Sequence, residues 1–329
     1  MKYLFNINPL PTAATGSPQS TPRDIHRFAI KPLLISFLLF ITLASASFAQ
    51  QTPLFSQHTF NKLLINPAYA GNQDQLQVTT LHRRQWDNFE GAPTTNTIAA
   101  HKSVKGKNIG VGLVVSSDKI GIHTDQRVYV SYAYKIKMAH GTLAMGIQGG
   151  FSRLQSDFSV LHLKTDDALV RGYRNTFTPN FGAGLYYSNE SFFAGLSVPY
   201  LMNNRLASPE ELLTMAQEKR YYFLTVGQVF TLNAQVKVMP SALLRVQEGN
   251  ATTAEVGANL ILNDVLTVGA SYRSEDALIG IVKIEVSQNI SAGYSYDHTV
   301  SDIGAYSNGS HEFMLSYRIP YTKRCHTYF

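Results

Sequence analysis

Cysteine, charge and long apolar runs are all scarce in this sequence of 329 residues, and each absence excludes a class of protein. The single cysteine, Cys325, rules out an internal disulfide and leaves no partner for a cysteine metal cluster. Beyond residue 49, no run approaches the roughly 18 apolar residues that a membrane-spanning helix needs. The net charge of +6 is divided equally between residues 1–49 and the remainder, so it is too mild to predict a nucleic-acid partner.

Sequence motifs of catalysis and of metal or cofactor binding are missing as well. The ten histidines are scattered, without an HExxH motif or a closely spaced group of Cys, His and Asp. No G-x-S-x-G elbow and no phosphate-binding loop occurs. We therefore expect no catalytic residue, no metal, no cofactor and no enzymatic activity. The alternative, in which isolated Ser, His and Asp residues meet in the folded chain and form a hydrolase site, stays open.

Residues 1–49 have the organisation of a secretory signal peptide. An apolar run of about twelve residues covers 33–44, follows Arg27 and Lys31, and precedes small residues at Ser47 and Ala49. The run is too short to span a bilayer as a helix. We expect cleavage near residue 49 and export of the remainder; an uncleaved anchor is the alternative.

Aromatic residues and a two-residue alternation are what the sequence has in abundance, with 18 Tyr and 18 Phe. The hairpin 127–155 shows the alternation most clearly: Val128, Val130 and Tyr132 share one parity, whereas Ser131 and Ala133 share the other. Successive side chains of a strand point to opposite faces, so each arm is apolar on one face only. Each arm runs for about a dozen residues, close to what a tilted strand needs to cross a bilayer.

The same pattern recurs along the chain and predicts about fourteen strands. Their expected ranges are 75–84, 93–102, 109–117, 125–138, 141–154, 179–188, 190–200, 220–231, 234–247, 251–262, 265–273, 277–286, 289–297 and 310–321. Alternate connections are tight, and the long ones, near 155–178, 201–219 and 298–309, all belong to the other set. Sorting of long loops to one end is typical of a transmembrane antiparallel β-barrel. A soluble sandwich or propeller, the alternative, has no reason to sort its loops in this way.

The barrel interpretation divides the chain into a signal peptide (1–49), an N-terminal periplasmic or plug segment (50–74), the barrel (75–321) and a tail (322–329). Residues 50–74 lack the strand period, and their apolar side chains predict one or two short helical turns docked in the barrel's periplasmic mouth. Ser208, Pro209 and Glu211 predict a short helix in an outer loop. Charged residues on the polar parity are expected to face the lumen, namely Arg127, Lys135, Lys137, Glu255, Lys283, Glu285 and Arg318.

Several blocks of the sequence form a recognisable series, and the most specific of them opens the mature chain. The blocks comprise Phe55, Ser56 and Gln57; Phe60 and Asn61; Asn66 to Gly71; Arg84, Gln85 and Trp86; Phe89; Gly91 to Thr95; Asp118 to Gly121; and Gly309 to Glu312. Taken in this order, they resemble the PorP/SprF family of outer-membrane proteins, which belongs to the type IX secretion and gliding-motility apparatus. Lys62 stands where the family often has Pro, and the leader is longer than usual.

The resemblance implies a non-enzymatic barrel in the outer membrane of a Gram-negative bacterium. Its implied partners are outer-membrane lipid, other secretion-system proteins and a cognate, adhesin-like secreted protein with a C-terminal targeting domain. The barrel would assist export or surface anchoring of that protein. Two alternatives stay open: a passive channel for small or apolar solutes, and a structural link to the periplasmic secretion ring.

The resemblance also supplies the candidate site residues, as partner-binding or plug positions. They are Phe55, Gln57, Asn66, Pro67, Tyr69, Gly71, Arg84, Trp86, Gly91 and Pro93. A purely structural explanation stands beside the functional one, because Asn66 and Pro67 can simply turn the chain and Gly71 can supply backbone freedom.

Overall fold

A computed structural model describes residues 54–73, 75–160, 172–203, 219–248 and 252–320 of the chain. These residues all belong to one compact unit that begins at Ala46. The predicted signal peptide, the outer-loop helix near Ser208 and the tail with Cys325 lie outside the described residues. Among the described residues, no helix is both long enough and apolar enough to cross a membrane.

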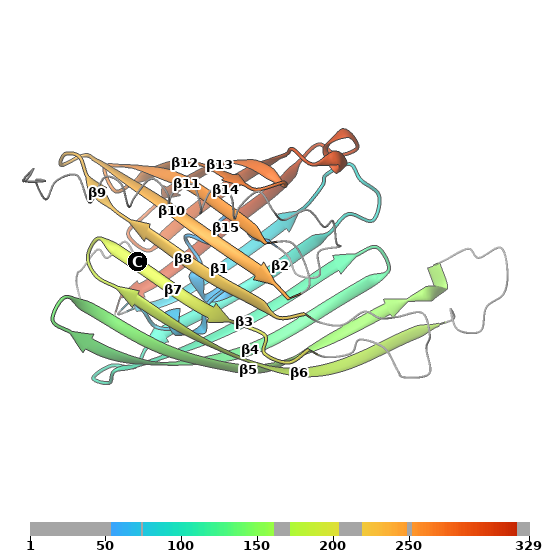
Figure 1. Cartoon of the computed structure of the whole chain (residues 1–329), viewed down its shortest axis with the longest axis horizontal. Coiled ribbons are helices and arrows are strands. Elements are labelled where there is room, and N and C mark those ends of the chain that lie inside the picture. Colours follow the sequence, from blue (N-terminus) through green and yellow to red (C-terminus); the bar gives the residue numbers. More distant parts are fainter. Residues whose placement is uncertain (1–53, 74, 161–171, 204–218, 249–251, 321–329) are drawn as a thin grey trace, which may run out of the picture. The chain divides into compact units, whose positions relative to one another are not determined.

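The described chain forms a closed antiparallel β-barrel (Figure 1). Each strand pairs with its neighbour in sequence except that β8 pairs with β10 and not with the two-residue β9; β1 pairs with β15, and the β10–β11 pairing completes the circuit. The strands are β1 (Gln75–Arg84), β2 (Thr94–Ser103), β3 (Ile109–Ile120), β4 (His123–Met138), β5 (Gly141–Asp157), β6 (Tyr173–Ser188), β7 (Phe192–Val198), β8 (Tyr221–Gln228), β9 (Phe230–Thr231), β10 (Val236–Gln247), β11 (Thr253–Leu262), β12 (Leu266–Arg273), β13 (Ala277–Glu285), β14 (Ile290–Thr299) and β15 (Ser310–Pro320).

Two of the fifteen labelled strands are halves of one, so the wall has the predicted fourteen strands. β8 and β9 both pair with β10 in one continuous register and are separated only by Val229. The break lies one register position away from Pro240, which has no N–H to donate to a neighbouring strand. On the other side, the backbone N–H of Val229 continues the pairing with β7 and donates to the carbonyl oxygen of Ser191 at 2.6 Å.

The predicted alternation decides which side chains face outward. In β4, Val130 and Tyr132 are exposed on the outer surface, whereas Tyr129, Ser131 and Ala133 are buried on the inner one. Exposed Val, Leu, Ile, Phe and Tyr side chains continue this outer surface over most strands. An apolar exterior and a polar or small interior are what a barrel in lipid requires.

The two ends of the barrel differ, and we name them by their connections. At the turn end, short connections join β2 to β3, β4 to β5, β6 to β7, β9 to β10, β11 to β12 and β13 to β14. The loop end carries the longer connections, including residues 158–172, 199–220 and 300–309. Two of these contain the short 3₁₀ turns η3 (Phe158–Val160) and η5 (Asp302–Ala305). β4, β5 and β6, at 16 to 17 residues each, are the longest strands of the wall.

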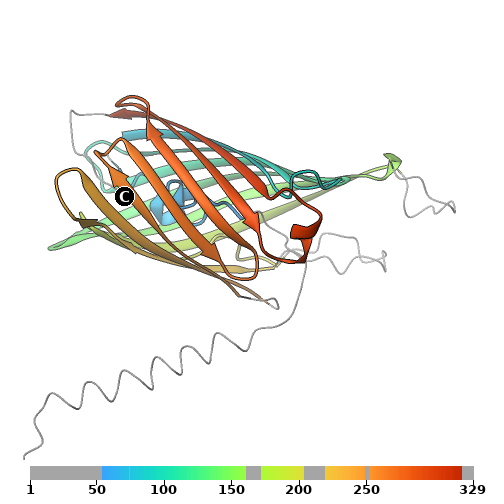
Figure 2. The same cartoon turned by 90° about the horizontal axis from the view of Figure 1, so that it is seen from above.

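Residues 54–73, which we call the luminal segment, lie inside the barrel (Figure 2). They form two 3₁₀ turns, η1 (Lys62–Leu64) and η2 (Pro67–Tyr69), as the helical spacing predicted. The molecule's main apolar core is the contact between this segment and the inner wall, with Leu63 and Tyr69 packed among wall residues such as Ala99 and Tyr186. The prediction that the segment stays at the mouth was wrong, because its first residues reach the loop-end half of the lumen.

Candidate functional site

The second turn of the luminal segment is fixed by its own cap and by the wall. Asn66 precedes Pro67, and its side-chain oxygen accepts the backbone N–H of Ala68 at 2.9 Å. The amide nitrogen of the same side chain donates to the carbonyl oxygen of Leu185 in β6, also at 2.9 Å. Asn66 therefore both starts the turn and attaches it to the barrel.

Glycines in the wall let the backbone of the segment approach closely. A Cβ atom at Gly146 in β5 would lie 2.2 Å from the backbone nitrogen of Ala68, and one at Gly110 in β3 would lie 1.9 Å from the carbonyl oxygen of Ala70. Neither distance is possible for a real side chain, so only glycine fits. The small residues on the inner parity thus accommodate the segment.

Aromatic rings from the luminal segment and from the barrel wall pack against each other. Tyr69 meets the rings of His101 and Tyr186 edge-on, with centroids 5.3 and 5.4 Å apart. Lys62 lies over the Phe193 ring, with Nζ 4.3 Å from the centroid, and donates to the carbonyl oxygen of Thr59 at 2.8 Å. Burial lowers the pKa of Lys62 from 10.5 to about 7.

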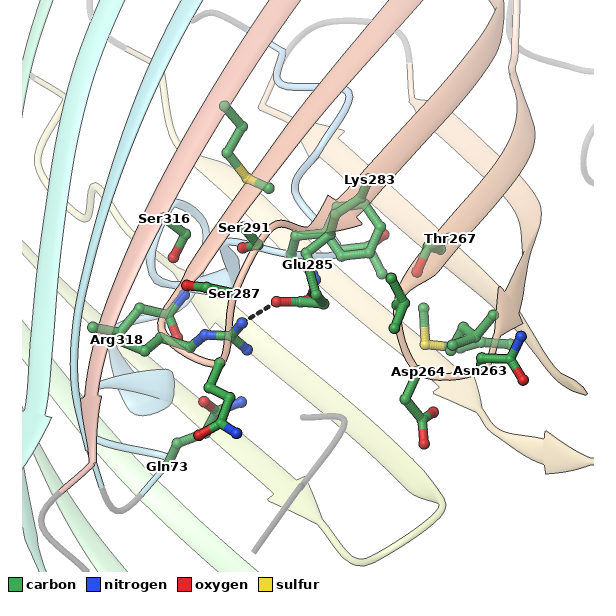
Figure 3. A pocket seen from close by; sticks show the side chains of 18 of the residues that line it. Gln73, Asn263, Asp264, Thr267, Lys283, Glu285, Ser287, Ser291, Ser316 and Arg318 are labelled. Carbon is green, nitrogen blue, oxygen red and sulfur yellow. Dashed lines mark hydrogen bonds and ion pairs between the residues drawn. The ribbon is translucent and has the colours of Figure 1, made fainter. Parts of the chain in front are cut away.

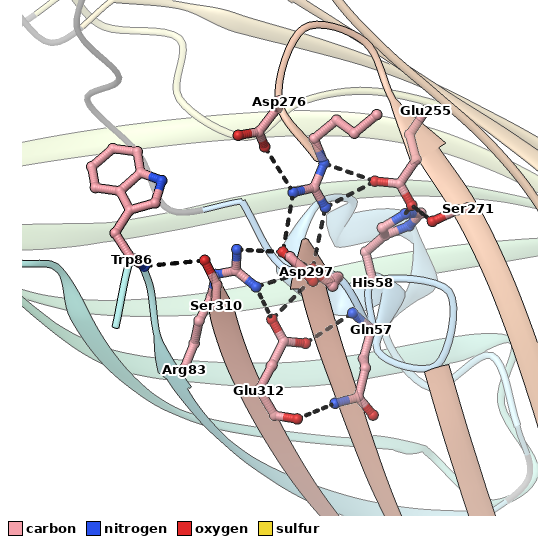
Figure 4. Close-up of polar contacts among 12 residues, drawn as sticks. Gln57, His58, Arg83, Trp86, Glu255, Ser271, Asp276, Asp297, Ser310 and Glu312 are labelled. Carbon is pink, nitrogen blue, oxygen red and sulfur yellow. Dashed lines mark hydrogen bonds and ion pairs between the residues drawn. The ribbon is translucent and has the colours of Figure 1, made fainter. Parts of the chain in front are cut away.

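Five charged side chains from five strands form a buried charge network toward the loop end (Figure 4). Nη2 of Arg83 lies 2.7 Å from Asp297, and Nη1 lies 3.1 Å from Glu312. Nε of Arg273 donates to Glu255 at 2.9 Å, and Nη1 lies 3.5 Å from Asp297, which links the two halves. All five side chains are at most 5% exposed.

The network binds the first residues of the luminal segment. The two carboxylate oxygens of Glu312 accept the backbone N–H groups of Ser56 at 2.9 Å and Gln57 at 2.8 Å. The hydroxyl of Ser56 donates to Asp297 at 2.7 Å, and Nε2 of His58 lies 3.2 Å from Glu255. Figure 4 shows Gln57 beside Glu312 and His58 beside Glu255.

Docking of the segment and hydrogen bonding of the buried carboxylates depend on each other. The network holds two guanidinium groups against three carboxylates, and Asp276, 3.1 Å from Arg273, adds a fourth. Buried charges are costly unless they are paired and hydrogen-bonded. The N–H groups of Ser56 and Gln57 add hydrogen-bond donors to those that the wall provides.

Within the described ranges, no group of three or more His, Cys, Asp or Glu side chains is arranged to hold a metal ion.

The predicted site residues separate into two groups in the structure. Those of the luminal segment are inside the barrel: Gln57, Asn66, Pro67 and Tyr69 are buried, and Phe55 is half-buried beside a small loop-end cavity. Gly71 has φ +62°, a region that favours glycine, and its N–H donates to Nδ1 of His101 at 3.2 Å.

The second group lies at the end of β1 and in the β1–β2 connection, at the loop end. Arg84 is exposed and pairs with Asp87 at 2.7 Å, and Trp86 donates its backbone N–H to Ser310 at 3.1 Å. The carbonyl oxygens of Gly91 and Pro93 accept the N–H groups of residues 121 and 85, both at 2.9 Å. The contacts of this group order the β1–β2 connection and tie it to the neighbouring connections of the loop end.

The sequence reasoning missed most of the charge network. It expected Glu255 to face the lumen, which the structure confirms, but it selected Arg84 and passed over Arg83, the arginine that points inward. Arg273 and Asp297 were not considered. The position of each residue in the two-residue alternation could have identified the network, because all these side chains are on the inner face of their strands.

The sequence matches a known family, and the fold is similar to several solved structures. Residues 47–317 match a family model described as "Type IX secretion system membrane protein PorP/SprF". No curated protein matches the chain in sequence. Similar solved structures include a Pseudomonas aeruginosa FadL homologue, at 13% identity and TM-score 0.44, covering 82% of this chain and 95% of that one. The CymD monoaromatic hydrocarbon channel has 10% identity and TM-score 0.48, covering 85% and 97%. The Acinetobacter baumannii protein Omp33 has 9% identity and TM-score 0.43, covering 75% and 99%.

Proposed function

The chain belongs to the PorP/SprF family of type IX secretion system membrane proteins and is an outer-membrane β-barrel, and from this premise we propose that it assists export or surface anchoring of a cognate secreted protein. In this proposal it acts without enzymatic chemistry. Its partners are other secretion-system proteins and a secreted, adhesin-like protein. The turn end then faces the periplasm and the loop end faces outward, as is usual for such barrels.

The observation that carries the proposal is the attached luminal segment. A barrel of this size leaves an open interior unless something fills it. Here the chain's own residues fill much of it, with Asn66 bound at β6 and Ser56 and Gln57 bound by Glu312. A filled lumen argues against a channel that conducts solutes, and it favours a protein that binds its partners at the two ends of the barrel.

The loop end offers a shaped surface for such work. The β1–β2 connection is ordered by the contacts of Trp86 and Gly91, and the β14–β15 connection is tied to it because Asp87 donates its N–H to Gly309 at 2.7 Å. Two connections held together in this way form one surface, which supports docking of a partner outside the membrane.

Deletion of the gene tests the proposal. We expect one exported protein to be missing from the cell surface, or released from it, as measured by surface proteolysis followed by mass spectrometry. Complementation with the intact gene should restore display, and purified protein in liposomes should allow no solute-driven swelling. Normal display of every exported protein in the deletion strain would contradict the proposal.

A further inference from the structure

A cavity of about 340 Å³ remains beside the luminal segment at the turn end (Figure 3). It reaches the tight turns of the wall, since Asn263 and Ser287 from the β11–β12 and β13–β14 connections line it. Tyr69 and Gln73 of the luminal segment close its other side. Its volume is at the lower end of the range for ligand sites in proteins.

The cavity has an apolar wall and a charged wall. Met239, Ile261 and Val265, from β10, β11 and the turn that follows, form the apolar wall together with Phe60 of the luminal segment. The charged wall comes from β13 and β15 and carries Lys283, Glu285 and Arg318. A ligand that fits both walls must combine an apolar group with a charge.

The charged wall has one positive charge in excess. Lys283 and Arg318 both donate to the carboxylate of Glu285, as Figure 3 shows for Arg318. The other acid in the lining, Asp264, is bound to Nζ of Lys237 at 2.8 Å. The wall therefore carries a net positive charge and attracts an anion.

We propose that this cavity binds a carboxylate of a polypeptide presented from the periplasm. The carboxylate lies against Arg318 and Lys283, and a neighbouring apolar side chain packs on the apolar wall. The rest of the lining favours a peptide over a lipid chain, because its hydroxyl and amide groups can bond to peptide groups and would lose those partners against an acyl chain. These groups belong to Gln77, Asn263, Thr267, Ser291 and Ser316.

A carboxylate can come from a chain terminus or from an Asp or Glu side chain, and three probes separate the sources. Each is a dye-labelled peptide, titrated against the full chain in detergent by fluorescence anisotropy: Ser-Gly-Ser-Leu with a free carboxylate, the same peptide as its amide, and Ser-Glu-Ser-Leu amide. We expect the free carboxylate to bind at least tenfold more tightly than the first amide. Comparable binding of the Glu peptide assigns the site to acidic side chains; equal binding of all three, or none, overturns the proposal.

Substitutions in the charged wall of the cavity should change peptide binding in opposite directions. Arg318→Gln should weaken binding about tenfold, the effect of losing one charge-assisted hydrogen bond. Glu285→Gln should tighten binding, because it releases two cations from their present partner. Lys137→Gln removes an exposed charge at the same end, outside the cavity lining, and should change nothing.

Heat-dependent gel migration confirms that each variant is folded. Weaker or equal binding by Glu285→Gln, or no loss in Arg318→Gln, would overturn the proposal. The test is independent of the secretion phenotype, so either proposal can fail while the other stands.

Discussion

Gln57 and Glu312 bind each other twice across 255 residues of sequence: the backbone N–H of Gln57 donates to the Glu312 carboxylate at 2.8 Å, and its side-chain amide donates to the Glu312 carbonyl oxygen at 3.1 Å. Gln57 lies near the start of the luminal segment, and Glu312 lies in β15, the last strand. The contact therefore joins the luminal segment to the seam where β15 meets β1 and the barrel closes.

Replacement of Glu312 tests that contact. Glu312→Ala removes the acceptor of two backbone N–H groups and one partner of Arg83, and should lower the free energy of unfolding by about 3–5 kcal/mol, as measured by thermal denaturation in detergent. Arg84→Gln, at the adjacent but exposed arginine, should change it by less than about 1 kcal/mol. Equal effects of the two variants would show that the network does not stabilise the fold.

The close approach of backbone to wall predicts a steric effect at Gly146. Gly146→Ala places a methyl group within 2.2 Å of the luminal segment and should displace it, at a cost of about 1–3 kcal/mol. Gly280→Ala is the matched control, because a Cβ there meets no atom within 4 Å. Protease sensitivity of the segment, compared between the two variants, is the measurement. Identical digestion patterns would contradict the close fit.

The wall was predictable from the sequence because its side chains alternate. Val130, Ser131, Tyr132 and Ala133 each face the side that parity assigns to them. In β1 the alternation is weak: Leu81 is apolar and points inward, so hydrophobicity does not reveal that Arg83 shares its face. Because apolar and charged side chains share this face of β1, the hydrophobic pattern did not indicate that Arg83 points into the lumen.

The depth of the luminal segment could not be predicted for a different reason. Its apolar residues indicated burial, and Asn66 with Pro67 indicated a turn, both of which the structure shows. Whether Ser56 lies at the mouth or deep in the lumen depends on Asp297 and Glu312, and nothing local in the sequence relates positions that are more than 240 residues apart.

Lys62 should make the stability depend on pH. Burial lowers its pKa from 10.5 to about 7, so between these values the unfolded chain binds more protons than the folded one. Stability should therefore rise as pH increases from about 7 to about 10.5. The neighbouring Tyr69 stays neutral in this window, because burial raises its pKa. Thermal denaturation across this range should show the rise in the wild type and a smaller one in Lys62→Met. Parallel curves would exclude Lys62 as the source.

Two buried arginines of the inner wall should respond differently to the same substitution. Arg83→Met leaves Glu312 without its cation and Asp297 with only the more distant Arg273, and should cost about 3–5 kcal/mol. Arg245 is 4% exposed, its Nε has no hydrogen-bond partner among the described residues, and its Cζ lies 5.1 Å from the centre of the Tyr221 ring. Arg245→Met should be neutral or stabilising in the same thermal assay, since it removes a buried charge that forms an ion pair with no carboxylate among the described residues. A large loss there would reveal an unrecognised partner.

Removal of the upper part of the luminal segment should open the barrel. Residues 54–65 contribute to the apolar core and occupy the binding groups of Glu312, Asp297 and Glu255, yet the hydrogen bonds that close the wall run between strands and do not involve them. A chain that keeps the leader and residues 66–73, with a Gly/Ser linker of equal length in place of 54–65, should form a less stable barrel. Water can then solvate the charge network, and a fourteen-strand wall without its filling leaves an aqueous path.

Liposome swelling with small sugars should be fast for this variant and absent for the wild type. Arg84→Gln, which leaves the lumen untouched, should stay impermeable; if the linker variant is equally impermeable, residues 54–65 are not what blocks the lumen.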